Sequence, residues 1–396
     1  MKKLNFIIKY GLALLLLSFY SCESWLNVTP SDRLSEEMLF NDREGFVKAL
    51  NGVYIELNTN ELYGRNLTAG ALDVMGQYYS VASSSHAFYN YGGLVYTGND
   101  EKALFDNMWQ KCYAVIACCN TIIEKCDENK AGLSPVWKGS IKGEALALRA
   151  MLHFDMLRLF GPLTSELDKE SIPYQTNSDQ TVTPLLSGSE VIGLILDDLK
   201  NAVGLLKDTD PYFVEEEFSD TDLNYRRFRM NYFAAKGLMA RVQLWGGDKE
   251  KAAITAKEVI AEGQAEGAEF FPFVTNSEAT SSNPDRVFYS EVLFGTYHSS
   301  REKLHEDLFA PTLESTSILT LAGTARRDDL YDNENDYRYS VWSTYNKNGT
   351  SVLYHRKFEK QDNVTASRQY MIPLIRMSEM YLIAVECCAV CEVPFT

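Results

Sequence analysis

The hydrophobic residues that follow residue 38 recur mostly at helical spacing. One long helix is predicted by apolar positions that step by four and three residues: Phe105, Trp109, Cys112, Ile116, Cys119, Ile123 and Cys126. A second helix carries apolar residues on two of its sides and should therefore pack on two faces: Ile141, Ala145, Leu148, Leu152, Met156 and Leu159, with Ala147, Met151 and Phe154. It should end at Gly161-Pro162, because glycine is conformationally free and proline lacks the backbone donor.

Three more helices are predicted before about residue 264. Ser187 and Glu190 form a capping box in front of the third helix. The fourth ends at Gly246-Gly247, and Asp248 is predicted to cap the fifth, which is rich in alanine. Small residues allow two helices to approach closely, so this helix–turn–helix is typical of a tetratricopeptide-type hairpin. No strict 34-residue repeat is present, so any such repeats are degenerate.

The pattern changes between about residues 264 and 372. Residues 287–289 and 291–294 are mostly apolar or aromatic and predict short strands among loops rich in Ser, Asn, Asp and Thr. A last helix is predicted after Pro373, with one apolar side: Leu374, Met377, Tyr381, Val385 and Cys388. The expected fold is mostly α, with a helical solenoid core, degenerate helical hairpins, and long loops with little β structure.

The net charge of the chain argues against two classes of binding partner, nucleic acids and anionic lipids. The chain has 54 acidic and 38 basic side chains, a formal net charge of −16. A sequence-independent nucleic-acid binder needs a basic surface to neutralise phosphates, and so does a protein that docks on anionic lipid. Neither class fits this chain. The 23 tyrosines are more informative, because a flat ring with a polar tip suits a contact surface.

The N-terminus predicts export. Two lysines precede an apolar stretch over residues 6–19, which is typical of a secretory signal peptide covering residues 1–21. The stretch is shorter than the roughly 20 residues that a spanning helix needs. Cys22 directly follows Ser21 and is predicted to be the acylation site of a bacterial lipoprotein, so that its lipid would anchor the protein. Ordinary secretion with a stray thiol at Cys22 is the alternative.

Signatures of catalysis or metal binding are weak. The chain has no glycine-rich phosphate loop, dinucleotide fingerprint, zinc-protease helix or nucleophile elbow, and its five histidines lack metal-ligand spacing. His153 lies inside the two-faced helix and is expected to be a core residue. Asp332, Glu334 and Asp336 are spaced like the start of a calcium loop, but the loop lacks its glycine and its final Glu. We therefore predict no enzyme, no cofactor and no metal, and a solvated acidic loop.

Aromatic residues in loop-like segments are the strongest sign of a ligand surface. Residues 77–96 and 337–345 combine rings with small polar residues, a composition typical of recognition surfaces. Ring faces can stack on the apolar faces of sugars. Six residues are predicted to form a platform that binds an oligosaccharide: Tyr78, Tyr79, Tyr89, Tyr91, Trp342 and Tyr345. The alternative is that these rings hold the loops against the helical core.

Several motifs in the same order resemble one known family. They are Cys22…Trp25-Leu26 with Ala49-Leu50-Asn51-Gly52, then Leu148-Arg149-Ala150, His153-Phe154-Asp155 and Phe160-Gly161-Pro162, then Ala240-Arg241 with Gly247-Asp248, and Arg376, Ser378-Glu379 and Tyr381-Leu382. Together they cover most of the chain and resemble the SusD-like (RagB/SusD) lipoproteins of Bacteroidetes. Residues 22–220 would be the N-terminal part of such a protein, and residues 221–396 its C-terminal part.

The resemblance implies a function. It implies a lipid-anchored protein at the surface of the outer membrane that captures a nutrient, usually a glycan and sometimes a peptide. It also implies a partner, a SusC-like TonB-dependent transporter, and no catalytic activity. In the family a further segment follows the last helix, so a C-terminally truncated member is expected. Peptide capture and a helical scaffold without a small ligand remain alternatives.

Overall fold

The computed structural model describes residues 36–179, 181–214, 217–265, 268–331, 333 and 335–391. Within these ranges the chain is mostly helical, and its strands form four separate two-stranded antiparallel sheets. This confirms the predicted fold class. The predicted signal peptide and Cys22 lie outside the described residues. None of the described helices is long and apolar enough to cross a membrane.

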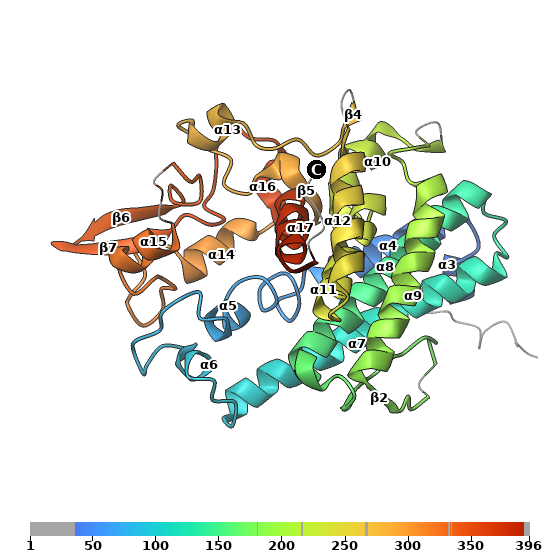
Figure 1. Cartoon of the computed structure of the whole chain (residues 1–396), viewed down its shortest axis with the longest axis horizontal. Helices are drawn as coiled ribbons and strands as arrows, with labels where there is room; N and C mark the ends of the chain where they lie inside the picture. The colour runs from blue at the N-terminus through green and yellow to red at the C-terminus, as the bar shows by residue number, and fades with distance from the viewer. Residues whose placement is uncertain are drawn as a thin grey trace, which may run out of the picture.

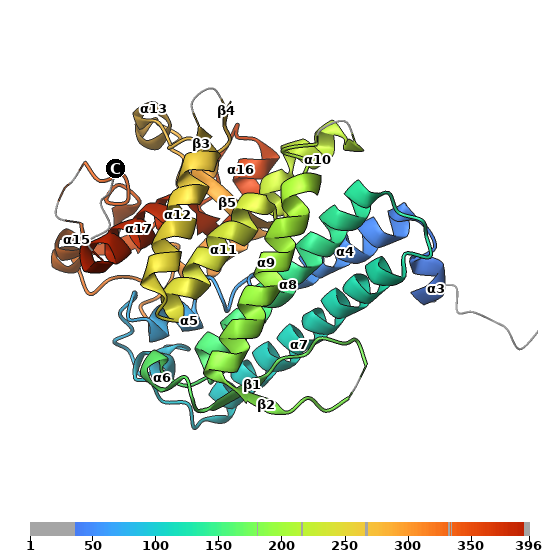
Figure 2. The same cartoon turned by 45° about the vertical axis from the view of Figure 1, so that its right-hand side comes forward.

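Four long helices form one side of the molecule (Figures 1 and 2). They are α4 (Arg43–Leu57), α7 (Asn99–Glu128), α8 (Pro135–Phe160) and α9 (Gly188–Thr209). Helix α8 contacts α4, α7, α9 and α11, which explains its two apolar sides. At Gly143 of α8 a side chain would meet Leu206 of α9, since a Cβ atom there would lie 2.7 Å from the Leu206 Cγ. Glycine is therefore needed for the close approach of these two helices.

The predicted helical hairpin is also present. Helices α11 (Tyr232–Trp245) and α12 (Lys249–Gly263) pack side by side, and the Asp248 side chain caps α12 by accepting from the Lys251 amide. Helix α17 (Met377–Cys391) packs against both. The Arg241 guanidinium joins α11 to α17 through two 2.6 Å hydrogen bonds to the Glu379 carboxylate.

The prediction for the last helix was wrong in its start and in its buried side. Residues 371–376 form strand β8, so the helix begins at Met377. Its buried residues are Met377, Met380, Ile383, Ala384 and Cys387, whereas Val385 is 55% exposed. The predicted stripe counted Leu374 as helical, and this error rotated the apparent apolar side away from the contacts with α11 and α12.

The other half of the molecule consists of loops, short helices and strand pairs. Strand β5 (Val292–Tyr297) pairs with β8 (Met371–Arg376), which confirms the strand predicted near residue 291. The strand predicted at 287–289 was wrong, because Phe288 has a left-handed backbone (φ 53°) and a 3-10 turn follows. Strands β6 (Trp342–Lys347) and β7 (Thr350–His355) form a hairpin, whose Asn348-Gly349 turn has two positive φ angles.

The remaining elements are short. The helices are α3 (Glu36–Leu39), α5 (Ala71–Met75), α6 (Tyr89–Gly92), α10 (Asp220–Asn224), α13 (Asn276–Thr280), α14 (Arg301–Leu308), α15 (Thr324–Leu330) and α16 (Ala366–Tyr370). The strands are β1 (Glu170–Pro173), β2 (Leu185–Ser187), β3 (Gln264–Ala265) and β4 (Ala268–Glu269). Single 3-10 turns lie at Thr164–Glu166, Arg226–Phe228 and Tyr289–Glu291.

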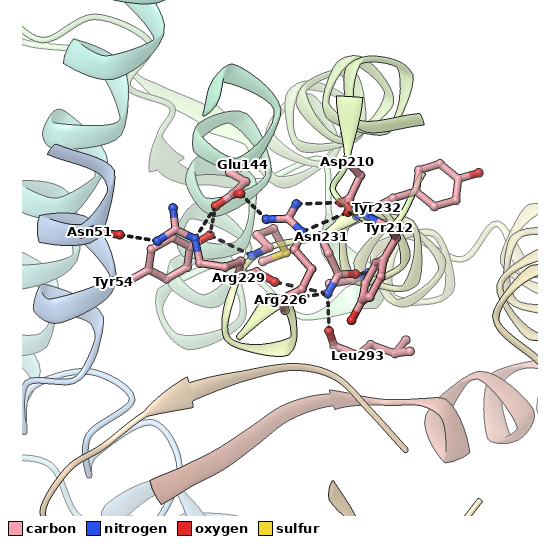
Figure 3. A network of polar contacts seen from close by, with 12 residues as sticks. Asn51, Tyr54, Glu144, Asp210, Tyr212, Arg226, Arg229, Asn231, Tyr232 and Leu293 are labelled. Carbon is pink, nitrogen blue, oxygen red and sulfur yellow. Dashed lines mark hydrogen bonds and ion pairs between the residues drawn. The ribbon is translucent and has the colours of Figure 1, made fainter. Parts of the chain in front are cut away.

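A buried polar network ties the helical side together (Figure 3). Arg226 lies between two carboxylates: it contacts Glu144 of α8 and makes a 2.6 Å ion pair with Asp210 at the end of α9. The Tyr54 hydroxyl of α4 donates to Glu144 at 2.6 Å, and Arg229 donates to the same carboxylate at 3.0 Å. Burial alone would raise the pKa of Glu144, but Arg229 and Arg226 outweigh it, so the pKa lies below its usual value.

The two larger hydrophobic cores among the described residues follow this division. The larger core lies in the helical side and includes residues from Phe40 to Cys387. It therefore contains residues from both of the predicted parts, 22–220 and 221–396. The smaller core lies in the loop-rich half and is made mainly of aromatic and aliphatic residues from 69–91, 304–358 and 372. Cys112, Cys119 and Cys126, which belong to the predicted apolar side of α7, are buried free thiols in the larger core.

Candidate ligand-binding site

The two aromatic segments predicted from the sequence do meet in space. The ring of Tyr79 lies 6.3 Å from that of Trp342 between centroids, and 5.5 Å from that of Phe309. Tyr79, Tyr91 and Trp342 are each only 4% exposed and belong to the smaller core. The expectation that these three present ring faces at a surface is therefore corrected. They hold the loops together, because packing rings on one another removes more apolar surface from water than leaving them at the rim.

The other three predicted residues are accessible. Tyr78 is 38% exposed, and Tyr89 and Tyr345 are each 44% exposed. Tyr78 shares a 3.0 Å hydrogen bond between its hydroxyl and that of Tyr331. Tyr89 begins α6, and Tyr345 lies on β6. Of these three, Tyr78 lines the cavity described next, while Tyr89 and Tyr345 do not.

A cavity of about 400 Å³ lies where four segments of the loop-rich half converge. Its volume is within the range of about 300–1,000 Å³ that is typical of ligand sites. The segments are residues 67–78, 286–288, 331–358 and 372–376, which are far apart in the sequence. The lining residues that carry rings or charges are Asp73, Tyr78, Arg286, Phe288, Tyr331, Arg338, His355, Lys357, Phe358 and Arg376.

Cationic side chains predominate in the lining of the cavity, although the whole protein is acidic. Four cationic side chains line it, those of Arg286, Arg338, Lys357 and Arg376, against one carboxylate, that of Asp73. Three of the cations have partners. Arg286 lies 3.2 Å from Glu359, Lys357 lies 3.4 Å from Asp73, and Arg338 makes a 2.6 Å ion pair with Asp336.

Arg376 differs from the other three cations. It ends β8, opposite Val292 of β5, and is half-buried. Its guanidinium makes no hydrogen bond and no ion pair with any residue in the described ranges. Burial raises the pKa of the Glu291 carboxyl. The charge of Arg376 acts in the opposite direction but is the smaller effect.

Burial shifts the pKa values of two titratable groups at the cavity. Burial lowers the pKa of His355 well below its usual value, and the charge of Lys357 adds to this, so the imidazole is neutral. Its Nδ1 accepts from the Lys357 amide at 2.9 Å. Burial raises the pKa of Tyr78, and its hydrogen bond to Tyr331 acts in the same direction. Among the described residues no cluster of His, Cys, Asp or Glu could hold a metal ion.

The remaining predictions from the sequence can now be placed. His153 is a core residue, as expected: it is fully buried, its Nδ1 bonds to the Arg149 carbonyl at 2.9 Å and its Nε2 accepts from the Gln175 amide at 3.0 Å. Asp332 and Glu334 of the acidic loop lie outside the described residues, whereas Asp336 pairs with Arg338.

Sequence reasoning missed most of the cavity. Arg286, Phe288, Tyr331 and Arg338 stand alone in the sequence and form no motif, and only the contacts between distant segments bring them together. Arg376 appeared only as part of the motif at the last helix. The Asn348-Gly349 dipeptide was the one strong local signal that could have located part of the site, because it predicts the β6–β7 hairpin.

Comparisons with known proteins agree with this fold. The sequence model of a SusD-like family, described as starch-binding and associating with the outer membrane, matches residues 24–244. The chain therefore belongs to this SusD-like family. A SusD-like protein P2 of Formosa agariphila is 26% identical over 265 residues, which cover 65% of this chain and 46% of that protein.

Two solved structures extend the comparison to most of the chain. A SusD superfamily protein of Bacteroides thetaiotaomicron superimposes with a TM-score of 0.68 at 21% identity, covering 88% of this chain and 76% of that one. A SusD-like carbohydrate-binding protein of Bacteroides vulgatus gives a TM-score of 0.66 at 20% identity, covering 88% and 72%. These likenesses establish a shared fold. The chain spans about half the length, or less, of the curated relatives that it matches.

Proposed function

We propose that this protein is a carbohydrate-binding lipoprotein of the outer membrane that captures an oligosaccharide and passes it to a SusC-like TonB-dependent transporter. The observation that carries the proposal is membership of a family described as starch-binding and associating with the outer membrane. The carbohydrate-binding protein of Bacteroides vulgatus that shares the fold supports it. The cavity beside Tyr78 supplies a site of suitable size.

In this proposal exposed rings make the ligand contacts and buried rings support them. Tyr78, with the neighbouring ring of Phe288, offers an apolar face at the cavity for a sugar ring. Tyr89 and Tyr345 are accessible and would contact parts of a chain that extends beyond the cavity. Tyr79 and Trp342 keep the segments that carry these residues in place.

The anchor and the transporter complete the proposal. Acylation of Cys22 would hold the protein at the outer membrane, and the mass of the mature N-terminal peptide tests this part, since an unmodified Cys22 would contradict it. Weak ligand affinity would suffice if the transporter encloses the captured ligand. Stacked sugars bury little surface, so we expect dissociation constants between micromolar and millimolar.

Calorimetric titration against a panel of glycans and peptides tests the proposal. We expect a glycan to bind the parent protein, and Tyr78→Ala to weaken it about tenfold or more through loss of a stacking face. Tyr225→Ala is the matched control, because Tyr225 is also exposed but does not line the cavity. Binding of peptides and of no glycan would favour peptide capture, and binding of neither would favour a helical scaffold; both results would contradict the proposal.

A further inference from the structure

The charge of the cavity contrasts with the charge of the chain. Carboxylates outnumber basic side chains 54 to 38 in the whole sequence, but cations outnumber carboxylates four to one around the cavity. A neutral ligand gains little from four cations, and desolvating them beside it costs free energy. The lining therefore needs an explanation beyond the stacking of neutral sugars.

Two of the arginines that line this cavity have donors that no described residue accepts from. The Arg376 guanidinium makes no hydrogen bond or ion pair within the part of the chain that the structure describes, as stated above. Arg338 uses its Nε and Nη2 on Asp336 and stacks over the Tyr331 ring with its guanidinium carbon 5.4 Å from the ring centroid, while its Nη1 donates to no described residue. Arg286 is nearly buried, and burial together with the charge of Arg356 lowers its pKa. Three of the four lining cations are thus paired with a carboxylate, and Arg376, together with the Nη1 of Arg338, supplies the donors left for a ligand.

The surroundings of these donors suit a charged sugar. Arginine presents a planar set of donors that matches the oxygens of a carboxylate or a sulfate in pairs. Tyr78 and Phe288 line the same cavity and offer apolar ring faces. We infer that the cavity binds an anionic carbohydrate, whose carboxylate or sulfate group contacts Arg376 and Arg338 while its ring lies against Tyr78. This inference rests on the proposed function and narrows its ligand class.

The test compares ligands that differ only in charge. The full chain is titrated with three oligosaccharides of equal length, one neutral, one with uronic acid residues and one with sulfate esters, at low and high salt. We expect at least one anionic ligand to bind about tenfold or more tightly than the neutral one, and its affinity alone to fall steeply with salt. Whether the uronic acid ligand or the sulfated ligand binds more tightly shows which anionic group the cavity prefers.

Variants locate the contact. Arg376→Gln and Arg338→Gln should each weaken binding of the anionic ligand about tenfold, and binding of the neutral ligand by clearly less. Lys48→Gln is the matched control, since it removes one positive charge from an exposed position on α4. Arg338 is itself largely exposed, so its variant will fold even if Arg376→Gln does not, and a thermal melt of each variant checks this.

The outcomes separate the two claims. The inference is overturned if neutral and anionic ligands bind with equal affinity. It is also overturned if the variants at Arg376 and Arg338 bind the anionic ligand as tightly as the parent does. In both cases the proposed function still stands. Absence of binding to any carbohydrate would overturn the proposed function and the inference with it.

Discussion

Tyr345 and Trp342 lie three positions apart on β6 but have different surroundings. Trp342 is buried, and its ring lies 4.4 Å from that of His355, whereas Tyr345 faces solvent. Aromatic residues in loop segments can therefore serve either packing or contact. The sequence does not distinguish the two roles at a single residue, because burial depends on which distant segment covers it.

The first prediction concerns these two residues. Trp342→Ala should lower the free energy of unfolding by about 3–5 kcal/mol, because it leaves a cavity in the smaller core. Tyr345→Ala should change it by less than about 0.5 kcal/mol, since Tyr345 is exposed and belongs to neither of the larger cores. Urea unfolding of the parent and both variants measures this. Equal stability of Trp342→Ala and the parent would mean that the smaller core does not depend on this ring.

At the scale of elements, ion pairs and hydrogen bonds hold helices that are distant in the sequence. Glu144 of α8 joins α4 through Tyr54, and it joins the segment after α10 through Arg226 and Arg229. Asn231 extends the network to β5 by donating to the Leu293 carbonyl at 2.7 Å (Figure 3). Removing one member would leave other charges buried without full compensation.

The second prediction tests this network. Glu144→Gln should lower the free energy of unfolding by about 3–5 kcal/mol, because Arg226 and Arg229 lose a buried counter-charge. Glu44→Gln is the control, since it breaks an exposed pair with Lys48 and should change little. Denaturant unfolding followed by circular dichroism gives both values. A Glu144→Gln protein as stable as the control would show that Asp210 alone compensates Arg226.

Across the whole molecule, burial lowers the pKa of every histidine. The pKa of each of the five is lowered, with burial as the first cause, and that of His153 falls to about 3. The folded state therefore favours neutral imidazoles. In the unfolded chain the same side chains take up protons near their ordinary value of 6.5.

The third prediction follows from this difference. Stability should be fully present above pH 6.5 and should fall as the pH drops towards 3, because the unfolded state binds protons that the folded state does not. Each such histidine contributes a slope of about 1.4 kcal/mol per pH unit in its window. His153→Gln should reduce the slope of unfolding free energy against pH between 6 and 4 by about that amount. Urea unfolding at several pH values checks this, and an unchanged slope would contradict it.

Much of the helical side was readable from the sequence. The two-sided pattern of α8, the capping box before α9, the glycine-rich end of α11 and the Asp248 cap are local features, and local features determine where a helix begins, ends and packs. Two of the motifs that resemble the SusD-like family, Leu148-Arg149-Ala150 on α8 and Ala240-Arg241 on α11, lie on these helices, and the resemblance was recognised without a structure.

Only the tertiary structure decided the site. Arg286, Arg338 and Arg376 come from three separate segments and meet only because β5 pairs with β8 and the β6–β7 hairpin folds towards α5. Contacts between distant segments also decide which rings are buried. They bury Tyr79, Tyr91 and Trp342 and leave Tyr78 exposed. Helical spacing along the chain carries no information about which loops cover one another, because loop packing depends on contacts between residues that are far apart in the sequence.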